Sequence, residues 1–460
     1  MRYLFDKRYS VCYNKFVRLF NLRTAIERTT MKLNYKRTIL VGFAFFLISA
    51  FWQAYDTIVP LILTNKFEMG QTYSGIIMSL DNIFAVVLLP IFGTLSDKTM
   101  TRFGKRTPYI TVGTVFASLF LIFLGFAPSL VLFIIVLLGA LLSMATFRSP
   151  AVALMPDVTV KPLRSKGNAI INLTGTAGGM IVLGLGIAFK TSTAGKTDFS
   201  MYLISVSVLM IAALVVFLLT VKEPLWSREA DEENERLDRE KAEKEKIVDD
   251  EKKAIGKLTK SELTSLILIL ASVALWYIGY NAITSKYSVY ATEVLKVPYT
   301  VTLLVAQGAA IVSYIPVGIV ASKIGRKKTI LAGVVMLTTA FAAASFIREG
   351  MSPVLMYMLF SLAGIGWATI NVNSFPMVVE LAKGGDVGKY TGFYYTASMT
   401  AQIVTPILSG FLVDQLGWFI FFPYAAFFAG CAFVTMFFVK HGDSRPEAQG
   451  ALEALAGADD

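Results

Sequence analysis

Two stretches of the sequence, PIFGTLSDKTMTRFGKR at residues 90–106 and PVGIVASKIGRKK at residues 316–328, each lead from an apolar run into a short basic segment. The two stretches begin 226 residues apart, and two prolines of later apolar runs, Pro150 and Pro376, have the same separation. A basic-x-x-Gly pattern also recurs at an offset of 225 residues. A nearly constant separation between matching landmarks predicts that the chain is a duplicated unit whose two copies run in parallel.

Apolar residues are abundant along the whole chain of 460 residues. They make up 55% of it and charged residues only 16%, whereas a soluble domain usually carries about 25% charged residues. A membrane-spanning helix needs about 20 apolar residues. The composition therefore excludes an ordinary soluble enzyme, a disordered chain and a disulfide scaffold. Twelve apolar stretches are present, at residues 39–63, 73–95, 108–126, 130–155, 168–189, 199–221, 263–290, 301–321, 329–347, 353–378, 390–413 and 418–439.

The twelve stretches form two sets of six, which predicts an all-α membrane protein with twelve transmembrane helices in two pseudo-symmetric six-helix bundles. The positive charge lies in short segments between apolar runs, and such lysine and arginine clusters mark cytoplasmic loops. We therefore expect both termini in the cytoplasm, and we interpret the net charge of +11 as topology rather than as nucleic-acid binding. The predicted parts are a basic cytoplasmic N-terminal tail (1–37), an N-terminal bundle (38–221), a charged cytoplasmic linker (222–262), a C-terminal bundle (263–440) and a cytoplasmic C-terminal tail (441–460).

Two segments outside the bundles carry expectations of their own. The alternating charges of the linker are typical of a solvated helix or a linker, and we expect a cytoplasmic tether, with a partner-binding helix as the alternative. Met31 opens a second plausible start, MKLNYKR, so residues 1–30 are expected to be a start-site extension.

The loop after the second apolar stretch carries a family signature. Gly-x-Leu-Ser-Asp followed by basic residues and glycine, at residues 93–106, resembles the helix 2–3 loop of the major facilitator superfamily. The longer form SDKTMTRFGKRTPYI (96–110) and the segment from Arg148 to Asn172 resemble the glycoside–pentoside–hexuronide:cation symporters and the related sucrose:proton symporters. The resemblance covers about residues 37–440. It implies a secondary active transporter that moves a glycoside, such as sucrose or a related disaccharide, by alternating access.

A departure from this family pattern bears on the coupling ion. Sodium-coupled members carry two aspartates one turn apart in helix 2 and another in helix 4, and the matching positions here are Ala85, Leu89 and Arg148. Because a hard sodium ion needs several oxygen ligands, the resemblance favours a proton symporter. The helix 4 acid of the sucrose branch has no counterpart either, since Leu141 is nearest by count. A sodium-coupled sugar carrier, an amphiphile carrier and a non-transporting sugar sensor stay open as alternatives.

Three charged residues fall inside apolar stretches of the first half: Asp56, Asp81 and Arg148. A charge at the centre of a bilayer costs about 2.5–3.5 kcal/mol on insertion scales, so such residues usually have a function. A carboxyl group binds a proton more tightly when desolvated and less tightly beside a guanidinium, which predicts that these residues couple transport to protons. A direct contact of Arg148 with either aspartate requires tilt or a broken helix, because residue counts place them at different depths. The alternative is that one aspartate only makes a polar contact near a helix end.

The counterparts of these three residues in the second half are uncharged, so the charged machinery is expected in the N-terminal half alone. The single histidine, His441, follows the last apolar stretch, which excludes an imidazole relay within the membrane.

Polar and aromatic residues recur at intervals of three, four and seven residues in several stretches, which places each set on one helix face. Facing a common centre, such faces would line an aqueous cavity and offer the polar partners and flat apolar surfaces that a sugar needs. The alternative for any one residue is a hydrogen bond between helices. The predicted substrate-binding residues are Gln53, Asn168, Asn172, Tyr277, Tyr280, Asn281, Gln307, Trp367, Asn371, Tyr395 and Gln402.

Charged residues at the ends of the stretches predict a cytoplasmic gate. In the superfamily, the loop acid that matches Asp97 faces a helix N-terminus across the cytoplasmic seam, an arrangement that the helix dipole favours. Its expected partner is the start of the eleventh stretch, near residues 388–392. Two pairs resemble the charges after helices 4 and 10, and the alternative for each is a solvated loop charge. The predicted gate residues are Asp97, Arg106, Asp157 paired with Arg164, and Glu380 paired with Lys389.

The residues that other chemistries require are missing from this sequence. His-Glu-x-x-His and Gly-x-Ser-x-Gly motifs do not occur, and the two cysteines and one histidine have no metal-ligand spacing. We therefore expect no enzyme activity, no cofactor, no metal site and no nucleic-acid partner. The expected partners are a small-molecule sugar, a proton and the lipid bilayer of a plasma membrane (a bacterial inner membrane), which a multi-pass monomer would span.

Overall fold

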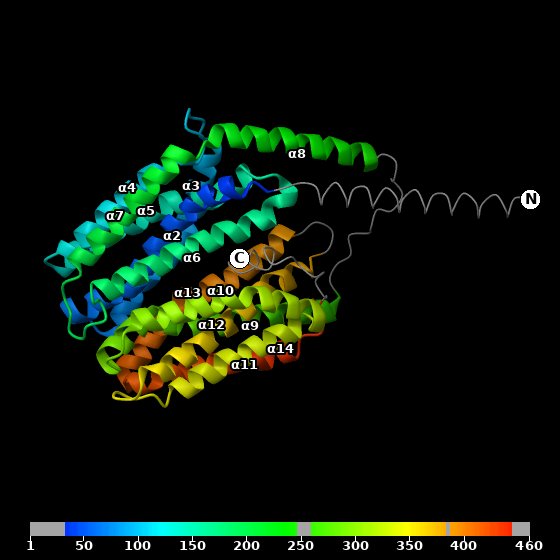
Figure 1. Cartoon of the computed structure of the whole chain (residues 1–460). Helices are drawn as coiled ribbons and strands as arrows, with labels where there is room; N and C mark the ends of the chain where they lie inside the picture. Colours follow the sequence, from blue (N-terminus) through cyan, green and yellow to red (C-terminus); the bar gives the residue numbers. More distant parts are fainter. Residues whose placement is uncertain (1–32, 246–258, 383–386, 444–460) are drawn as a thin grey trace, which may run out of the picture.

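The computed structural model describes residues 33–245, 259–382 and 387–443. All regular elements in these ranges are helices, and twelve of them are long and apolar enough to cross a membrane. They form two bundles, one from each half of the sequence (Figure 1), which confirms the predicted all-α membrane fold. The possible start at Met31 and most of both predicted tails lie outside the described residues.

The N-terminal bundle contains six long helices. They are α2 (Tyr35–Leu61), α3 (Gln71–Lys98), α4 (Thr107–Phe126), α5 (Leu130–Asp157), α6 (Arg164–Ala188), which follows the 3₁₀ turn η2 (Lys161–Leu163), and α7 (Ser200–Thr220). The side chains of Asn34 and Ser129 accept backbone amide hydrogen bonds at the starts of α2 and α5, which satisfies amides that lack helical partners. Pro108 lies at the start of α4, where its missing N–H costs little.

The C-terminal bundle repeats this packing. Its helices are α9 (Lys260–Val289), α10 (Tyr299–Ile324), α11 (Arg326–Ala344), α12 (Pro353–Val379), α13 (Val387–Leu416) and α14 (Phe421–Phe437), which follows the 3₁₀ turn η4 (Trp418–Ile420). In each bundle the fourth helix packs on the second and third, the sixth on the first and third, and the fifth on the first. The first helix of each bundle also ends in a π-helical turn, η1 (Ile62–Lys66) or η3 (Tyr290–Val294). This agreement supports the duplication that the sequence predicts.

One further helix, α8 (Glu223–Glu245), lies across one end of the N-terminal bundle (Figure 1). Arg37 of α2 forms an ion pair with Glu229 of α8. The backbone amide of Lys161 donates to the Asn234 side chain at 2.8 Å. The first part of the predicted linker is therefore a helix, and polar side chains of this helix bind the N-terminal bundle. We call the end that α8 covers the α8 end, and the opposite end the far end.

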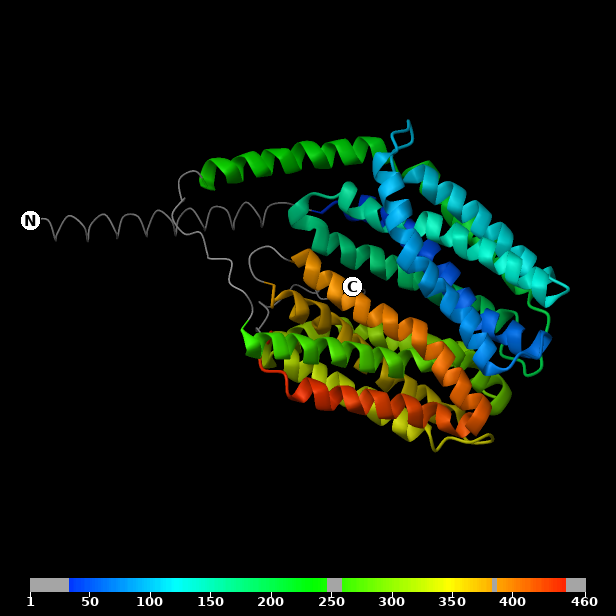
Figure 2. The ribbon, with the colours of Figure 1, turned by 180° about the vertical axis from the view of Figure 1, so that it is seen from behind.

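The two bundles meet along α3 with α13, α2 with α9, and α6 with α10. Figure 2 shows α3 and α13 side by side and converging toward the far end. Two glycines allow this approach, because a Cβ on Gly75 would lie 2.0 Å from the Pro406 carbonyl oxygen and one on Gly410 would lie 2.1 Å from that of Gln71. Larger residues at these positions would force the two backbones apart.

Candidate functional site

Three charged side chains lie within electrostatic reach of one another inside the N-terminal bundle, and we call Asp56 of α2, Asp81 of α3 and Arg148 of α5 the charged cluster. All three are half-buried, and each carboxylate interacts electrostatically with the guanidinium. Asp81 Oδ1 also accepts hydrogen bonds from the backbone amide of Asn82 (2.6 Å) and from its side-chain amide (2.7 Å). The Arg148 guanidinium lies 5.4 Å from the ring centroid of Trp52, close enough for a cation–π contact. The structure thus brings together the three residues predicted for proton coupling.

The charged cluster borders the interface between the two bundles. Tyr395 of α13, from the opposite bundle, interacts electrostatically with Arg148. Nearby, the Gln307 side-chain amide of α10 donates to the Gln53 side-chain oxygen of α2 at 2.6 Å, which joins the bundles directly. Two predicted substrate residues therefore bind each other across the interface, and a third, Tyr395, faces the cluster.

Three aromatic residues of the C-terminal bundle form a second group, which we call the aromatic cluster: Tyr277 and Tyr280 of α9 and Trp367 of α12. The rings of Tyr280 and Trp367 stack with centroids 3.6 Å apart and an interplanar angle of 4°. Tyr277 meets Trp367 edge-on at 5.2 Å. These rings provide a flat apolar surface, which suits the C–H face of a sugar or another planar group.

Several amide oxygens among the predicted substrate residues are buried without a hydrogen-bond partner in the described part of the chain. They are Oδ1 of Asn172 and of Asn371, whose residues are 5% and 7% exposed, and Oε1 of Gln307. A buried acceptor without a donor is costly unless water or a ligand supplies one. These atoms therefore favour a ligand that donates hydrogen bonds.

Two of the remaining predicted substrate residues make side-chain hydrogen bonds to backbone carbonyls of their own helices. The Asn281 side-chain amide donates to the Tyr277 carbonyl of its own helix at 2.9 Å. Gln402 donates in the same manner to the Ser398 carbonyl at 3.4 Å. Asn168 is half-buried near the start of α6. These bonds lie within a helix, so they match neither the predicted sugar contact nor the alternative of a hydrogen bond between helices.

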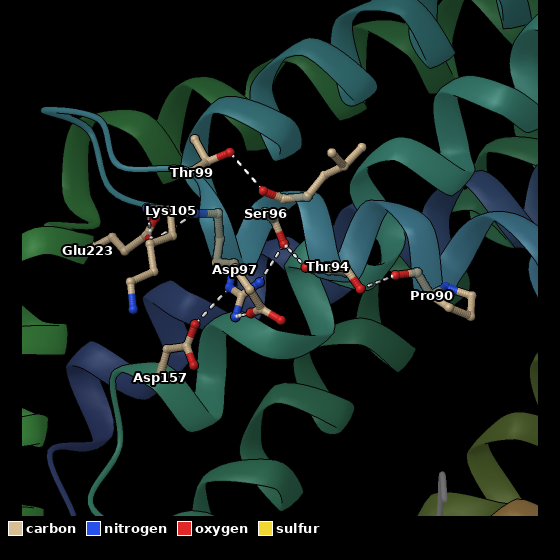
Figure 3. Close-up of polar contacts among 11 residues, drawn as sticks. Pro90, Thr94, Ser96, Asp97, Thr99, Lys105, Asp157 and Glu223 are labelled. Atoms are coloured by element: carbon tan, nitrogen blue, oxygen red, sulfur yellow. Dashed lines mark hydrogen bonds and ion pairs between the residues drawn. The ribbon is translucent and has the colours of Figure 1, made fainter.

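The predicted gate is centred on Arg106, which is only 5% exposed. Figure 3 shows Ser96, Asp97 and Asp157, which surround its guanidinium. Its guanidinium donates to Asp157 at 2.7 Å, to Asp97 and to Ser96. Burial by itself lowers the pKa of a guanidinium, but the hydrogen bonds and charges of Asp157 and Asp97 hold the pKa of Arg106 above its ordinary value. Arg106 therefore stays charged and fastens the 99–106 loop to α3 and α5.

The residues of two predicted ion pairs of the gate bind other partners than those predicted. Asp157 binds Arg106 instead of Arg164, whose Nε donates to the Thr159 carbonyl at 3.2 Å. Glu380 pairs with Arg326 at the start of α11. Lys389 instead lies 5.8 Å from the ring centroid of Phe393. Other basic residues thus reach these acids, and the pairings that the family resemblance implied are wrong.

Asp97 likewise binds within its own bundle, through Arg106, and it has no ion pair with the described residues at the start of α13. The expected contact across the seam would need the bundles to close at the α8 end, whereas the hydrogen bonds at 2.6–2.9 Å between them near Gln71 lie at the far end.

A buried glutamate that the sequence analysis missed fixes the same loop. Glu223, 2% exposed at the start of α8, accepts hydrogen bonds from the amides of Lys105 (2.6 Å), Arg106 (2.8 Å) and Thr107 (2.8 Å) and from the Thr107 hydroxyl (2.7 Å). These amides open α4, where a carboxylate also benefits from the helix dipole. Gly104 passes the carboxylate with a φ of +111°, and a Cβ there would lie 2.2 Å from Glu223 Cδ. The sequence signal was an acid two residues after the sixth apolar stretch.

The sequence analysis also missed a charged residue inside the C-terminal bundle. Lys286 of α9 is 1% exposed, and its ammonium donates to the Gln71 carbonyl of α3 at 2.9 Å. The expectation that the charged machinery lies in the N-terminal half alone is therefore wrong. The signal was a lysine within the apolar stretch 263–290, in the last turn of its helix.

Comparison with known proteins identifies the family. The Major Facilitator Superfamily matches residues 41–367 and 299–456. The chain belongs to this superfamily. An uncharacterized MFS-type transporter of Methanocaldococcus jannaschii, MJ1317, is 24% identical to this major facilitator over 389 residues, which are 82% of this chain and 88% of that protein. An MFS-type transporter of Metarhizium rileyi, ppzB, is 27% identical over 110 residues, which are 24% and 22% of the two chains.

Solved structures of several transporters share the major facilitator fold. The nucleoside transporter NupG, as a mutant, has a TM-score of 0.62 at 14% identity and covers 87% of this chain and 98% of its own. A bacterial homologue of the human lysosomal transporter Spinster, inward-facing and occupied, has a TM-score of 0.65 at 13% identity with coverages of 89% and 97%. The inward open xylose transporter XylE from E. coli has a TM-score of 0.63 at 13% identity, and the match covers 91% of this chain and 98% of XylE. The superfamily that the sequence predicted is confirmed, and these matches establish the fold rather than the substrate.

Proposed function

We propose that this transporter moves a glycoside, such as a disaccharide, together with a proton across a plasma membrane. The observation that carries the proposal is the charged cluster of Asp56, Asp81 and Arg148, which borders the bundle interface with Tyr395 of the other bundle beside it. Two acids and one base at the moving interface of a major facilitator are an arrangement that can take up and release a proton during the cycle.

The coupling follows from counting the charges in the cluster. With both acids ionised, the cluster carries a net charge of −1, and one bound proton makes it neutral. A net charge in surroundings of low dielectric is costly, so the bundles reorient more readily after a proton has bound. When that proton leaves on the other side, both acids are ionised again and attract the Arg148 guanidinium more strongly. Proton and substrate would thus move in the same direction.

A glycoside fits the remaining groups of the site. The stacked rings of Tyr280 and Trp367 offer a flat face for sugar C–H groups. The unpaired acceptors on Asn172, Gln307 and Asn371 would receive sugar hydroxyl groups. We assign the α8 end to the cytoplasm, because lysine and arginine gather in the loops at that end.

Two measurements test this proposal. A sugar that binds should raise the thermal stability of the purified protein, and in proteoliposomes an imposed inward proton gradient should drive its accumulation. Asp198→Asn is a matched control, since Asp198 is exposed in the loop before α7, and this variant should accumulate the sugar as the wild type does. Uptake that ignores both proton and sodium gradients would contradict coupling. Uptake driven by sodium, or stabilisation by a lysolipid instead of a sugar, would favour the alternative carriers.

A further inference from the structure

Lys286 and Asp414, both from the C-terminal bundle, bind the same turn of the N-terminal bundle at the far end. The Lys286 ammonium donates to the Gln71 carbonyl at 2.9 Å. Asp414, near the end of α13, accepts from the backbone amides of Gln71 (2.8 Å) and Thr72 (2.7 Å) and from the Thr72 hydroxyl (2.6 Å). One cation and one anion thus hold the first two residues of α3 by their backbone groups.

The two charges lie in different surroundings but interact with each other. Lys286 is 1% exposed, whereas Asp414 is exposed to solvent. Their charges attract one another within the C-terminal bundle, where α9 packs on α13. If α3 moves away, the buried ammonium loses its carbonyl acceptor, which is costly unless another partner replaces it. Asp414 is the acid that can serve, because it loses its own donors in the same movement.

The surrounding contacts show that this is where the bundles are closed. The backbones of α3 and α13 touch at Gly75 and Gly410, next to the bound turn. Elsewhere at this end, Glu293 of η3 accepts from the Asn65 side chain at 2.8 Å, and the hydroxyl oxygens of Thr191 and Tyr299 lie 2.7 Å apart. Every one of these contacts joins one bundle to the other.

We propose that Lys286 and Asp414 form a clasp that keeps the far end closed, and that the clasp opens by exchanging partners. In the closed state both residues bind the start of α3. In the open state they bind each other and leave α3 free to move. They are positioning residues of the transport cycle, since they act through the bundle contact and not through the substrate. The proposed clasp does not depend on which sugar or ion is carried, so it is independent of the proposed function.

Thiol labelling of the purified full-length protein in detergent tests the clasp without any substrate. Cys12 and Cys431 are first replaced by serine, and Thr300→Cys is introduced as the reporter. Thr300 lies at the start of α10, is 2% exposed, and its hydroxyl lies 3.3 Å from that of Ser192 across the interface. A water-soluble maleimide should therefore react slowly while the far end is closed.

Lys286→Met and Asp414→Asn should each raise the labelling rate about tenfold, the change expected when a hydrogen bond to a charged group is lost. Asp414→Glu keeps the carboxylate, and its labelling rate should stay within about threefold of the rate measured with Lys286 and Asp414 unchanged. Lys190→Met, which alters an exposed lysine just after α6, is the matched control and should leave the rate unchanged. Should Lys286→Met fail to fold, Asp414→Asn alone decides. Unchanged labelling in Asp414→Asn, or an equal increase in the Lys190→Met control, overturns the proposal.

Discussion

Removal of the Glu223 carboxylate is expected to release the start of α4. This carboxylate is 2% exposed and accepts four hydrogen bonds of 2.6–2.8 Å, three of them from backbone amides that have no helical partner. Loss of a helix cap costs about 1 kcal/mol, and loss of the dipole interaction up to about 2 kcal/mol. The cost of leaving buried backbone donors unpaired is already contained in these two free energies and is not added again. We therefore expect Glu223→Ala to destabilise the junction of the 99–106 loop with α4 by about 3 kcal/mol.

Hydrogen exchange read by mass spectrometry measures this effect at the junction itself. A loss of about 3 kcal/mol corresponds to roughly 100-fold faster exchange, because each 1.4 kcal/mol is a factor of ten. The amides to follow are those of Lys105, Arg106 and Thr107. Glu229→Ala on the same helix is the control, because Glu229 and Arg37 are both more than 40% exposed (47% and 41%) and such a pair contributes less than about 1 kcal/mol. Equal protection of these amides in the wild type and in Glu223→Ala would refute the reasoning. An equal loss of protection in Glu223→Ala and in Glu229→Ala would refute it as well.

Three other outcomes can be measured. Gly410→Val should reduce uptake at least about tenfold, because its Cβ would lie 2.1 Å from the Gln71 carbonyl oxygen. Gly184→Val is the control and should leave uptake nearly unchanged, since no atom lies within 4 Å of a Cβ at Gly184. Similar losses of uptake in both variants would contradict this prediction. Trp367→Ala removes one partner of the 3.6 Å stack and should weaken sugar binding by about tenfold in thermal-shift titrations, and unchanged affinity would argue against the aromatic surface. The hydrogen bond from the Ser200 amide holds the pKa of Asp198 below its ordinary value. The stabilisation of the folded state is therefore present above the unfolded pKa of about 3.9 and is lost as pH falls through the folded pKa. The Tm of the wild type should exceed that of Asp198→Asn by less at about pH 3 than at pH 7, and a constant difference in Tm would count against this prediction.

Much of the fold follows from local features of the sequence. Apolar length located all twelve spans, and the repeated landmarks indicated the two bundles. The helices extend beyond the apolar runs, as in α3, which covers Gln71–Lys98 where apolarity predicted 73–95. Polar residues at helix ends continue the backbone hydrogen bonds although they do not favour lipid. Helix bounds therefore depend on caps and loops as well as on hydropathy.

The charged cluster could be predicted because each member is conspicuous within its own apolar run. Asp56, Asp81 and Arg148 require no knowledge of the tertiary structure to be noticed, whereas their mutual placement does. The partners in the gate could not be predicted in this way. Arg106 reaches Asp157 from 51 residues away, and which basic residue reaches which acid depends on how the loops pack.

Glu223 and Lys286 show a second limit of sequence reasoning. Glu223 binds amides 116–118 residues away, and backbone donors carry no signature in the sequence. Lys286 lies inside an apolar stretch, but its partner is likewise a backbone carbonyl, 215 residues away. Charged side chains that bind backbone groups of distant segments can be recognised only when the tertiary structure is known.

The central claim, that the charged cluster couples sugar transport to protons, is tested most directly by two transport modes of Asp81→Asn in proteoliposomes. The variant should lose accumulation driven by a proton gradient at least about tenfold, since one proton-binding group has been removed. It should still exchange labelled sugar for unlabelled sugar at a rate near that of the wild type, because exchange needs no net proton release. Full gradient-driven accumulation in Asp81→Asn, or loss of exchange to the same extent as accumulation, would contradict the account.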